Sequence, residues 1–115
     1  MTIVRIDHDI PYSLYNTNYV REYIERLPYP VSEVYMREST GGNTHLKVII
    51  PMEISPLDEI IIRAIMHDDE RRIRGDLERY ALESPVFGLL FDEKKFSDGS
   101  LTKCGEWVKI NHQKQ

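Results

Sequence analysis

Two polar motifs near the start of the chain contain the residue types that could carry chemistry. The first, Asp7-His8-Asp9, directly follows the β-branched stretch Ile3–Ile6. Carboxylates at positions i and i+2 of a strand point to the same side, so Asp7 and Asp9 can hold one Mg²⁺ or Mn²⁺ ion together. The competing interpretation is a polar exit from the strand into a loop before Pro11.

The second motif is the sequence STGGNTH at residues 39–45, which lies between two predicted strands. Glycine and asparagine tolerate the positive φ of tight turns, so we predict a hairpin turn with positive φ at Gly41 or Gly42. The turn amides, the Ser39 hydroxyl and the His45 imidazole can contact a phosphate. His45 can equally be a strand residue that forms a hydrogen bond across the hairpin.

Composition limits the classes of protein to which the chain can belong. Its 115 residues are enough for one domain, residues 1–115, with about 111–115 as a flexible tail. An apolar share of 41% with 30% charged residues is ordinary for a soluble protein. No apolar run approaches the roughly 20 residues that span a bilayer, and the single cysteine, Cys104, excludes an internal disulfide. We therefore expect a cytoplasmic protein.

The net charge of −4 argues against a protein that coats nucleic acid non-specifically, because such binding depends on Lys and Arg. A local basic site remains open. Arginines gather at Arg71, Arg72, Arg74 and Arg79, directly after the acidic residues 68–70. This segment can be a helix with charges that complement its dipole, or a patch that faces phosphates.

Periodicity predicts alternating strands and helices. The predicted strands are Thr2–Ile6, Val31–Glu38, Leu46–Ile50, Val86–Phe91 and Trp107–Ile110. One helix is predicted over Asn16–Leu27, a second after the N-cap Ser55 with Pro56 in its first turn, and a third after the N-cap Asp69. His67, beside Asp68 and Asp69, is a capping residue or a metal ligand.

Each predicted helix has an apolar row that we expect to be buried. In the first helix the row contains Tyr15, Tyr19, Val20, Tyr23, Ile24 and Leu27, whose tyrosines could alternatively stack on bases. In the second it contains Leu57, Ile61, Ala64 and Ile65. In the third it contains Ile73, Leu77, Tyr80 and Ala81.

This order of elements predicts an α+β fold, with a mostly antiparallel sheet and helices packed on one face. The other face is then open for a ligand or a second subunit. Lys47 should share the side of His45, because alternate strand residues point the same way. We expect Val34, Met36, Val48 and Ile50 to remain partly uncovered, and pairing of two copies would bury them. A homodimer is therefore expected.

Residues 3–9 (IVRIDHD) and 30–51 (PVSEVYMRESTGGNTHLKVIIP) together resemble the catalytic core of the archaeo-eukaryotic primase superfamily, particularly its primase-polymerase branch. The resemblance lies in an apolar strand ending in Asp-x-Asp and a Ser/Gly turn followed by His. It implies that Asp7 and Asp9 hold the catalytic metal. It also implies that His45, with Ser39 and the turn amides, contacts the triphosphate of a nucleotide.

Two departures from the superfamily pattern bear on activity. The superfamily requires a third carboxylate on a later strand. Asp92, after the predicted strand Val86–Phe91, is the well-placed candidate, since Asp76 falls within a predicted helix. The chain is also short for a complete polymerising core.

The second half resembles small proteins of archaeal viruses and plasmids. The shared pattern is a Gly-turn-His hairpin, a helix, an Asp-Asp break, and an Arg-rich helix before a strand like GLLFDEK.

Two hypotheses follow. The favoured one is a small accessory protein of a virus or plasmid that binds nucleic acid or a nucleotide, as a trimmed or inactive primase-like domain. Its candidate nucleotide contacts are Ser39, Gly41, Gly42, His45 and Lys47, and its candidate nucleic-acid contacts are Arg37, Arg71, Arg72 and Arg74. The alternative is an active metal-dependent nucleotidyl or phosphoryl transferase with Asp7, Asp9, His45 and Asp92 as catalytic residues.

Overall fold

The computed structural model describes residues 1–82, 93–95 and 101–111. The predicted strand Val86–Phe91, Asp92 and the tail after residue 111 lie outside these ranges. The elements are β1 (Thr2–Pro11), the 3₁₀ turn η1 (Tyr12–Leu14), α1 (Thr17–Arg26), β2 (Glu33–Glu38), β3 (Asn43–Ile50), α2 (Pro56–Ile65), α3 (Glu70–Ala81), β4 (Glu93–Lys95), β5 (Leu101–Lys103) and β6 (Val108–Ile110).

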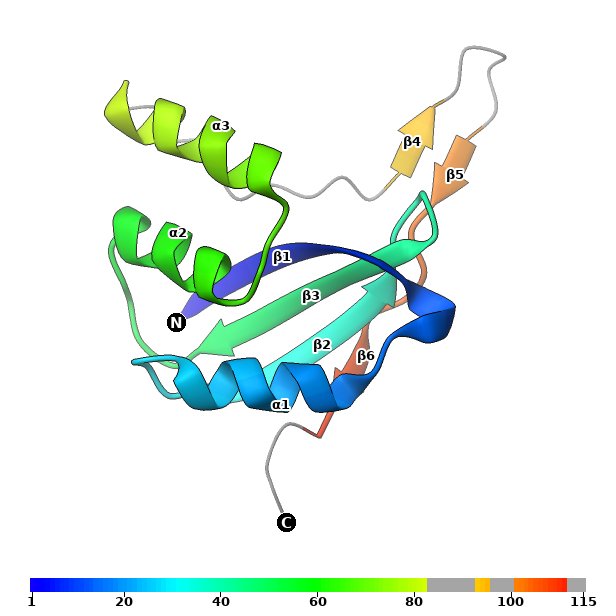
Figure 1. The fold of residues 1–115 in the computed structure, drawn as a ribbon, viewed down its shortest axis with the longest axis horizontal. Coiled ribbons are helices and arrows are strands. Elements are labelled where there is room, and N and C mark those ends of the chain that lie inside the picture. The colour runs from blue at the N-terminus through cyan, green and yellow to red at the C-terminus, as the bar shows by residue number, and fades with distance from the viewer. Residues whose placement is uncertain (83–92, 96–100, 112–115) are drawn as a thin grey trace.

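The main sheet has four antiparallel strands in the order β1-β3-β2-β6, and β4 and β5 form a separate two-stranded hairpin (Figure 1). The fold is therefore α+β, as the sequence predicts. Strand β3 lies between β1 and β2, and in both pairings His45 is matched directly, to Asp7 on one side and to Arg37 on the other. No helix in the described part of the chain is long and apolar enough to cross a membrane.

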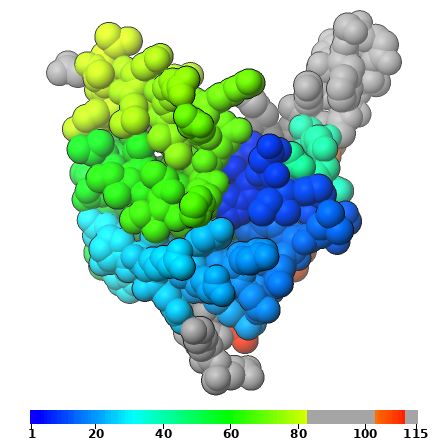
Figure 2. All heavy atoms as spheres, viewed as in Figure 1, coloured from blue at the N-terminus to red at the C-terminus, as the bar shows by residue number. Residues whose placement is uncertain are grey.

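The core lies between the sheet and the helices α1 and α2, which cover one face of it (Figure 1). In the space-filling view these two helices hide most of the sheet, and the dark blue of β1 reaches the surface beside α3 (Figure 2). The fully or nearly fully buried apolar residues of this core are Val4, Ile6, Val20, Val34, Leu46, Val48, Ile50, Ile62, Met66 and Ile110. Their alternation along the strands assigns Arg5, Asp7, His45 and Lys47 to the opposite face.

The residues expected to drive dimer formation are covered. Val34, Val48 and Ile50 are fully buried and Met36 packs against them, because all four lie on the face under the helices. That part of the prediction was wrong, since the sequence does not say which strand face the helices take. The homodimer itself stays a prediction.

The three helix starts agree with the sequence. The side chains of Asn16, Ser55 and Asp69 each accept a hydrogen bond from a backbone N–H in the first turn of their helix. Pro56 occupies the first turn of α2. Polar side chains that accept hydrogen bonds from first-turn N–H groups therefore determine where these helices begin.

The buried faces of α2 and α3 differ from the prediction. Of the row expected in α2, Ile61 is 45% exposed, and the helix instead buries Ile60, Ile62 and Arg63. In α3, Leu77 is 43% exposed, and the single buried residue is Asp76. Leu57, Ala64, Tyr80 and Ala81 are likewise exposed, and Ile65 and Ile73 are half-buried. A buried ion pair between Arg63 and Asp76 holds one charged residue of each helix in the interface between α2 and α3.

In α1, Val20 is buried, and Tyr15, Tyr23, Ile24 and Leu27 pack partly buried against the core, as predicted. Tyr19 is exposed. The tyrosine row is thus mainly a packing surface.

The outer edge of β1 is capped by the α2–α3 junction. The Asp7 N–H donates to Asp68 Oδ1 (2.7 Å), and the Asp69 N–H donates to the Asp7 carbonyl oxygen (3.0 Å). Arg72 Nη1 donates to the carbonyl oxygen of Arg5 (3.3 Å). These groups take the place of a neighbouring strand, which protects the edge and fixes the backbone on which Asp7 stands.

His8 connects β1 to the helices. Its Nε2 donates to the Met66 carbonyl oxygen (2.5 Å), so its Nδ1 accepts from the Tyr15 hydroxyl (2.7 Å). Burial lowers the pKa of His8 because the charged imidazolium loses its hydration, although the Met66 carbonyl partly opposes this.

The hairpin turn gives a first prediction. Gly42 has φ +87°, as predicted for one of the two turn glycines, and its carbonyl accepts from the Tyr12 N–H (2.9 Å). Gly42→Ala should lower the free energy of unfolding by about 1–2 kcal/mol, because an L-residue is strained there. Gly41→Ala, where an added Cβ meets nothing within 4 Å, is the matched control. Equal stability of the two variants in urea denaturation would contradict this account.

The lowered pKa of His8 gives a second prediction. Below the ordinary histidine pKa of about 6.5, His8 is protonated in the unfolded chain but still neutral in the folded chain until the pH reaches its lower folded-state pKa. The contribution of His8 to stability is therefore complete above that pH and is lost as the pH falls toward the folded-state pKa. Urea denaturation between pH 8 and pH 5 should show a weaker pH dependence for His8→Gln than for the parent. Tyr19→Phe, which changes an exposed tyrosine of α1 and leaves the imidazole and its partners intact, should keep the parent's dependence, and identical slopes for all three would refute the explanation.

Candidate functional site

Three polar side chains from neighbouring strands lie side by side on the face opposite the helices. Arg37 Nε donates to His45 Nδ1 (3.0 Å), and His45 Nε2 lies 3.9 Å from Asp7 Oδ1. Because Nδ1 is the acceptor, the ring proton of neutral His45 is on Nε2, on the side of Asp7. We call this set the Asp7–His45–Arg37 row. The row brings together one residue of each sequence motif, Asp7 and His45, although His45 is not among the residues that line the hollow described below.

Burial and neighbouring carboxylates disfavour the ionised form of Asp7. Its pKa is raised, chiefly by burial, and further by the carboxylates of Asp68, Asp69 and Asp9, while Arg72 opposes the increase. A bound cation would relieve both the lost hydration and this repulsion. The electrostatics of Asp7 therefore fit a cation site.

A hollow of about 620 Å³ opens between the end of β1 and the first turn of α3. Its lining residues are Asp7, Asp9, His67, Asp68, Asp69, Glu70 and Arg71. Asp9 is exposed in the wall and accepts a hydrogen bond from Asn43 Nδ2 (2.8 Å), which links it to the hairpin. The two candidate metal ligands thus face one open, mainly acidic space.

His67 shapes this hollow through its backbone. It directly follows α2 with φ +59°, a left-handed conformation, and its N–H donates to the Ala64 carbonyl oxygen (3.1 Å). Its ring contacts that of Tyr23, with centroids 5.1 Å apart. The turn at His67 brings Asp68 and Asp69 to β1, which favours the capping interpretation over a metal ligand.

A metal ion held by Asp7 and Asp9 would need further ligands from a bound molecule. Within residues 1–82, 93–95 and 101–111, no three His, Cys, Asp or Glu side chains come together as a metal-binding group. Mg²⁺ is commonly held by one or two carboxylates together with the phosphates of a substrate. Asp7 and Asp9 fit that arrangement, with phosphate oxygens completing the coordination. The proposed third carboxylate, Asp92, lies outside the described residues.

Most polar groups of the hairpin turn form hydrogen bonds with each other. Ser39 Oγ accepts from the Asn43 N–H (3.0 Å), and the Ser39 carbonyl accepts from the Gly42 N–H (3.0 Å). The Ser39 N–H donates to the Asn43 carbonyl oxygen (2.8 Å). Ser39 and Gly42 therefore act by holding His45 in place, and Gly41 is exposed at the tip.

The candidate basic residues other than Arg37 lie in different surroundings. Lys47 lies on the side of His45 as predicted, with its Nζ 4.6 Å from the Trp107 ring centroid and 4.9 Å from that of Tyr35. Arg72 is paired with Asp68 and bonded to the carbonyl oxygen of Arg5, and Arg74 forms an exposed pair with Glu70 within α3. Arg71 is exposed in the lining of the hollow.

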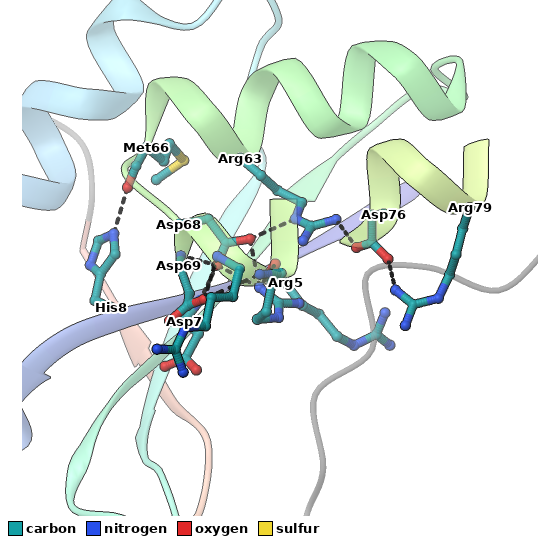
Figure 3. A network of polar contacts seen from close by, with 11 residues as sticks. Arg5, Asp7, His8, Arg63, Met66, Asp68, Asp69, Asp76 and Arg79 are labelled. Carbon is teal, nitrogen blue, oxygen red and sulfur yellow. Dashed lines mark hydrogen bonds and ion pairs between the residues drawn. The ribbon is translucent and has the colours of Figure 1, made fainter. Parts of the chain in front are cut away.

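The sequence analysis missed a buried ionic cluster behind the site, drawn in Figure 3. Arg63, which is fully buried, donates through Nε to Asp68 Oδ2 (2.7 Å) and through Nη1 to Asp76 Oδ2 (2.6 Å). Arg72 adds a second cation at Asp68, and Arg79 donates to Asp76 Oδ1 (2.8 Å). The spacings of Asp68 with Arg72 and of Asp76 with Arg79 were the available signal.

Hydrogen bonds decide the state of Arg63. Burial by itself lowers its pKa, but the hydrogen bonds to Asp68 and Asp76 outweigh that effect and raise the pKa, so the guanidinium stays charged. Among the described residues, Arg63 Nη2 is the single buried side-chain polar atom without a hydrogen-bond partner.

Comparison of the chain with protein-family models, with curated proteins and with solved structures found no match.

The ionic cluster gives a third prediction. Arg63→Gln should lower the free energy of unfolding by about 3 kcal/mol or more, because Asp68 and Asp76 then lose their buried counter-charge. Arg74→Gln, which breaks an exposed pair one turn into α3, should cost about 0.5 kcal/mol at most. Chemical denaturation of both variants measures the difference, and comparable losses would show that the cluster does not stabilise the fold.

Proposed function

We propose that this protein is a small accessory protein that binds a nucleotide or polynucleotide phosphate, through a divalent cation, at the Asp7 end of the open sheet face. The observation that carries the proposal is the Asp7–His45–Arg37 row, which joins an anion for the cation and a donor for the phosphate. His45 is 6% exposed and its Nε2 faces Asp7, so a phosphate oxygen would have to enter beside Asp7 to accept from His45 while it shares the cation with Asp7 and Asp9.

Binding is a better-supported function than catalysis. The described residues supply two carboxylates at the end of β1, of which Asp7 lies next to His45, whereas phosphoryl transfer of the primase type calls for a third. The two are also unequal, since Asp7 is half-buried and Asp9 is exposed. A nucleotide-binding site retained on a trimmed primase-polymerase-like domain would need only these two carboxylates and His45.

The proposal gives a fourth prediction. Calorimetric titration with Mn²⁺ and a nucleoside triphosphate should show binding that Asp7→Asn weakens at least tenfold, because the variant loses the charge that holds the cation. His45→Ala should weaken nucleotide binding while leaving the binding of Mn²⁺ alone nearly unchanged. Glu53→Gln, at the far end of the sheet where Glu53 pairs with the N-terminus, is the matched control.

The pH dependence follows from the raised pKa of Asp7. Protons compete with the cation for Asp7, so Mn²⁺ affinity should fall as the pH is lowered. The fall should begin at a higher pH than for an ordinary aspartate, whose pKa is 3.8. Unchanged affinity in Asp7→Asn would place the cation elsewhere and refute the site.

An active nucleotidyl transferase is the second candidate, because Asp7 and Asp9 line one hollow and His45 lies next to Asp7. Its test is extension of a labelled primer with nucleotides and Mn²⁺. Incorporation that disappears in Asp7→Asn would establish the enzyme, and no incorporation at a nucleotide concentration that saturates binding would restrict the function to binding.

The biological setting belongs to the same proposal: a cytoplasmic protein of a virus or plasmid that acts as a homodimer. Light scattering at micromolar concentration distinguishes the dimer from the monomer mass of 13.6 kDa.

A further inference from the structure

The sheet face opposite α1 and α2 presents two rows of polar side chains between the strands. The strand register places Asp7, His45 and Arg37 in one row, and Arg5, Lys47, Tyr35 and Lys109 in the next. The second row runs across all four strands of the sheet and contains three cations.

Charge on this face is opposite in sign to that of the whole chain. Across these rows and the adjoining Glu33, the accessible cations Arg5, Lys47 and Lys109 outnumber the carboxylates of Asp7 and Glu33, while Arg37 is 4% exposed and bonded to His45. Glu33 is itself engaged, because it accepts from the Tyr35 hydroxyl (2.6 Å) and lies 3.5 Å from Lys109 Nζ. With a chain charge of −4, this local excess of cations favours a polyanionic ligand.

Trp107, the only tryptophan of the chain, lies beside these cations. The Arg37 guanidinium is 4.3 Å from its ring centroid and Lys47 Nζ is 4.6 Å from it, while Lys47 is also close to the Tyr35 ring. Such contacts hold the indole in place through cation–π attraction. Trp107 and Tyr35 are both half-buried.

We infer that this face binds single-stranded nucleic acid, with a base stacked on Trp107 and backbone phosphates at Lys47 and Lys109. The inference rests on the proposed function and extends it: the strand continues from the phosphate at His45 across the second row. Stacking requires an unpaired base, which a duplex does not offer. An acidic peptide would meet the cations but supply no base for the indole.

The test uses the fluorescence of Trp107 in the full chain, in buffer with a chelator and no added metal. A 12-nucleotide single strand, as DNA or as RNA, should quench the fluorescence saturably. A duplex of the same length should reach the same quenching only at an oligonucleotide concentration at least tenfold higher. Higher salt should weaken single-strand binding, because phosphate contacts release counterions.

Variants are measured by the anisotropy of a labelled single strand. Trp107→Leu should weaken binding about tenfold and Trp107→Phe much less, since a smaller ring still stacks. Lys47→Gln should reduce the slope of log affinity against log salt by about one. Arg26→Gln, on the exposed last turn of α1, is the control and should change neither quantity. If Trp107→Leu fails to fold by circular dichroism, Lys109→Gln tests the same row.

Several outcomes would overturn the inference: equal quenching by duplex, no quenching at all, displacement of the single strand by polyglutamate at equal charge concentration, or full affinity in Trp107→Leu. The proposed nucleotide site fails separately. Asp7→Asn should abolish Mn²⁺-dependent nucleotide binding without weakening the metal-free binding of the single strand. Nucleotide binding without single-strand binding would remove only the present inference.

Discussion

The Asp68 carboxylate is the interaction on which the rest of the structure depends. It accepts from Arg63 and Arg72, and it also accepts from the backbone N–H groups of Asp7 and Asp69. One buried side chain thus joins α2, α3 and the edge of β1. Since an unpaired buried carboxylate is costly, the two arginines offset the burial of Asp68, and Asp68 in turn raises the pKa of Asp7.

The register between β1 and β3 converts this scaffold into a site. Alternation separates β1 into a core face, with Val4, Ile6 and His8, and an open face with Asp7. A slip of one residue would exchange the two sets, so the buried apolar residues fix the position of Asp7 opposite His45. The stability of the core and the geometry of the site therefore have the same origin.

The sequence was sufficient for the features that depend on local chemistry. Polar N-caps, the turn glycine and the strand alternation that puts Lys47 beside His45 were all predicted correctly, because neighbouring residues decide them. The inward faces of α2 and α3 were not, because burial of Arg63 and Asp76 depends on partners from different elements. For the same reason Trp107, which reaches Arg37 and Lys47 from the far end of the chain, was not recognised as part of the open face.

The central claim is that Asp7, Asp9 and His45 form one phosphate and cation site. The most direct measurement is a crystal structure of the protein with Mn²⁺ and a non-hydrolysable nucleoside triphosphate, using the anomalous signal of manganese. The account predicts a peak about 2.1–2.3 Å from the carboxylates of Asp7 and Asp9, with a phosphate oxygen within hydrogen-bond distance of His45 Nε2. Manganese or triphosphate bound at another place, or no binding at saturating concentration, would contradict it.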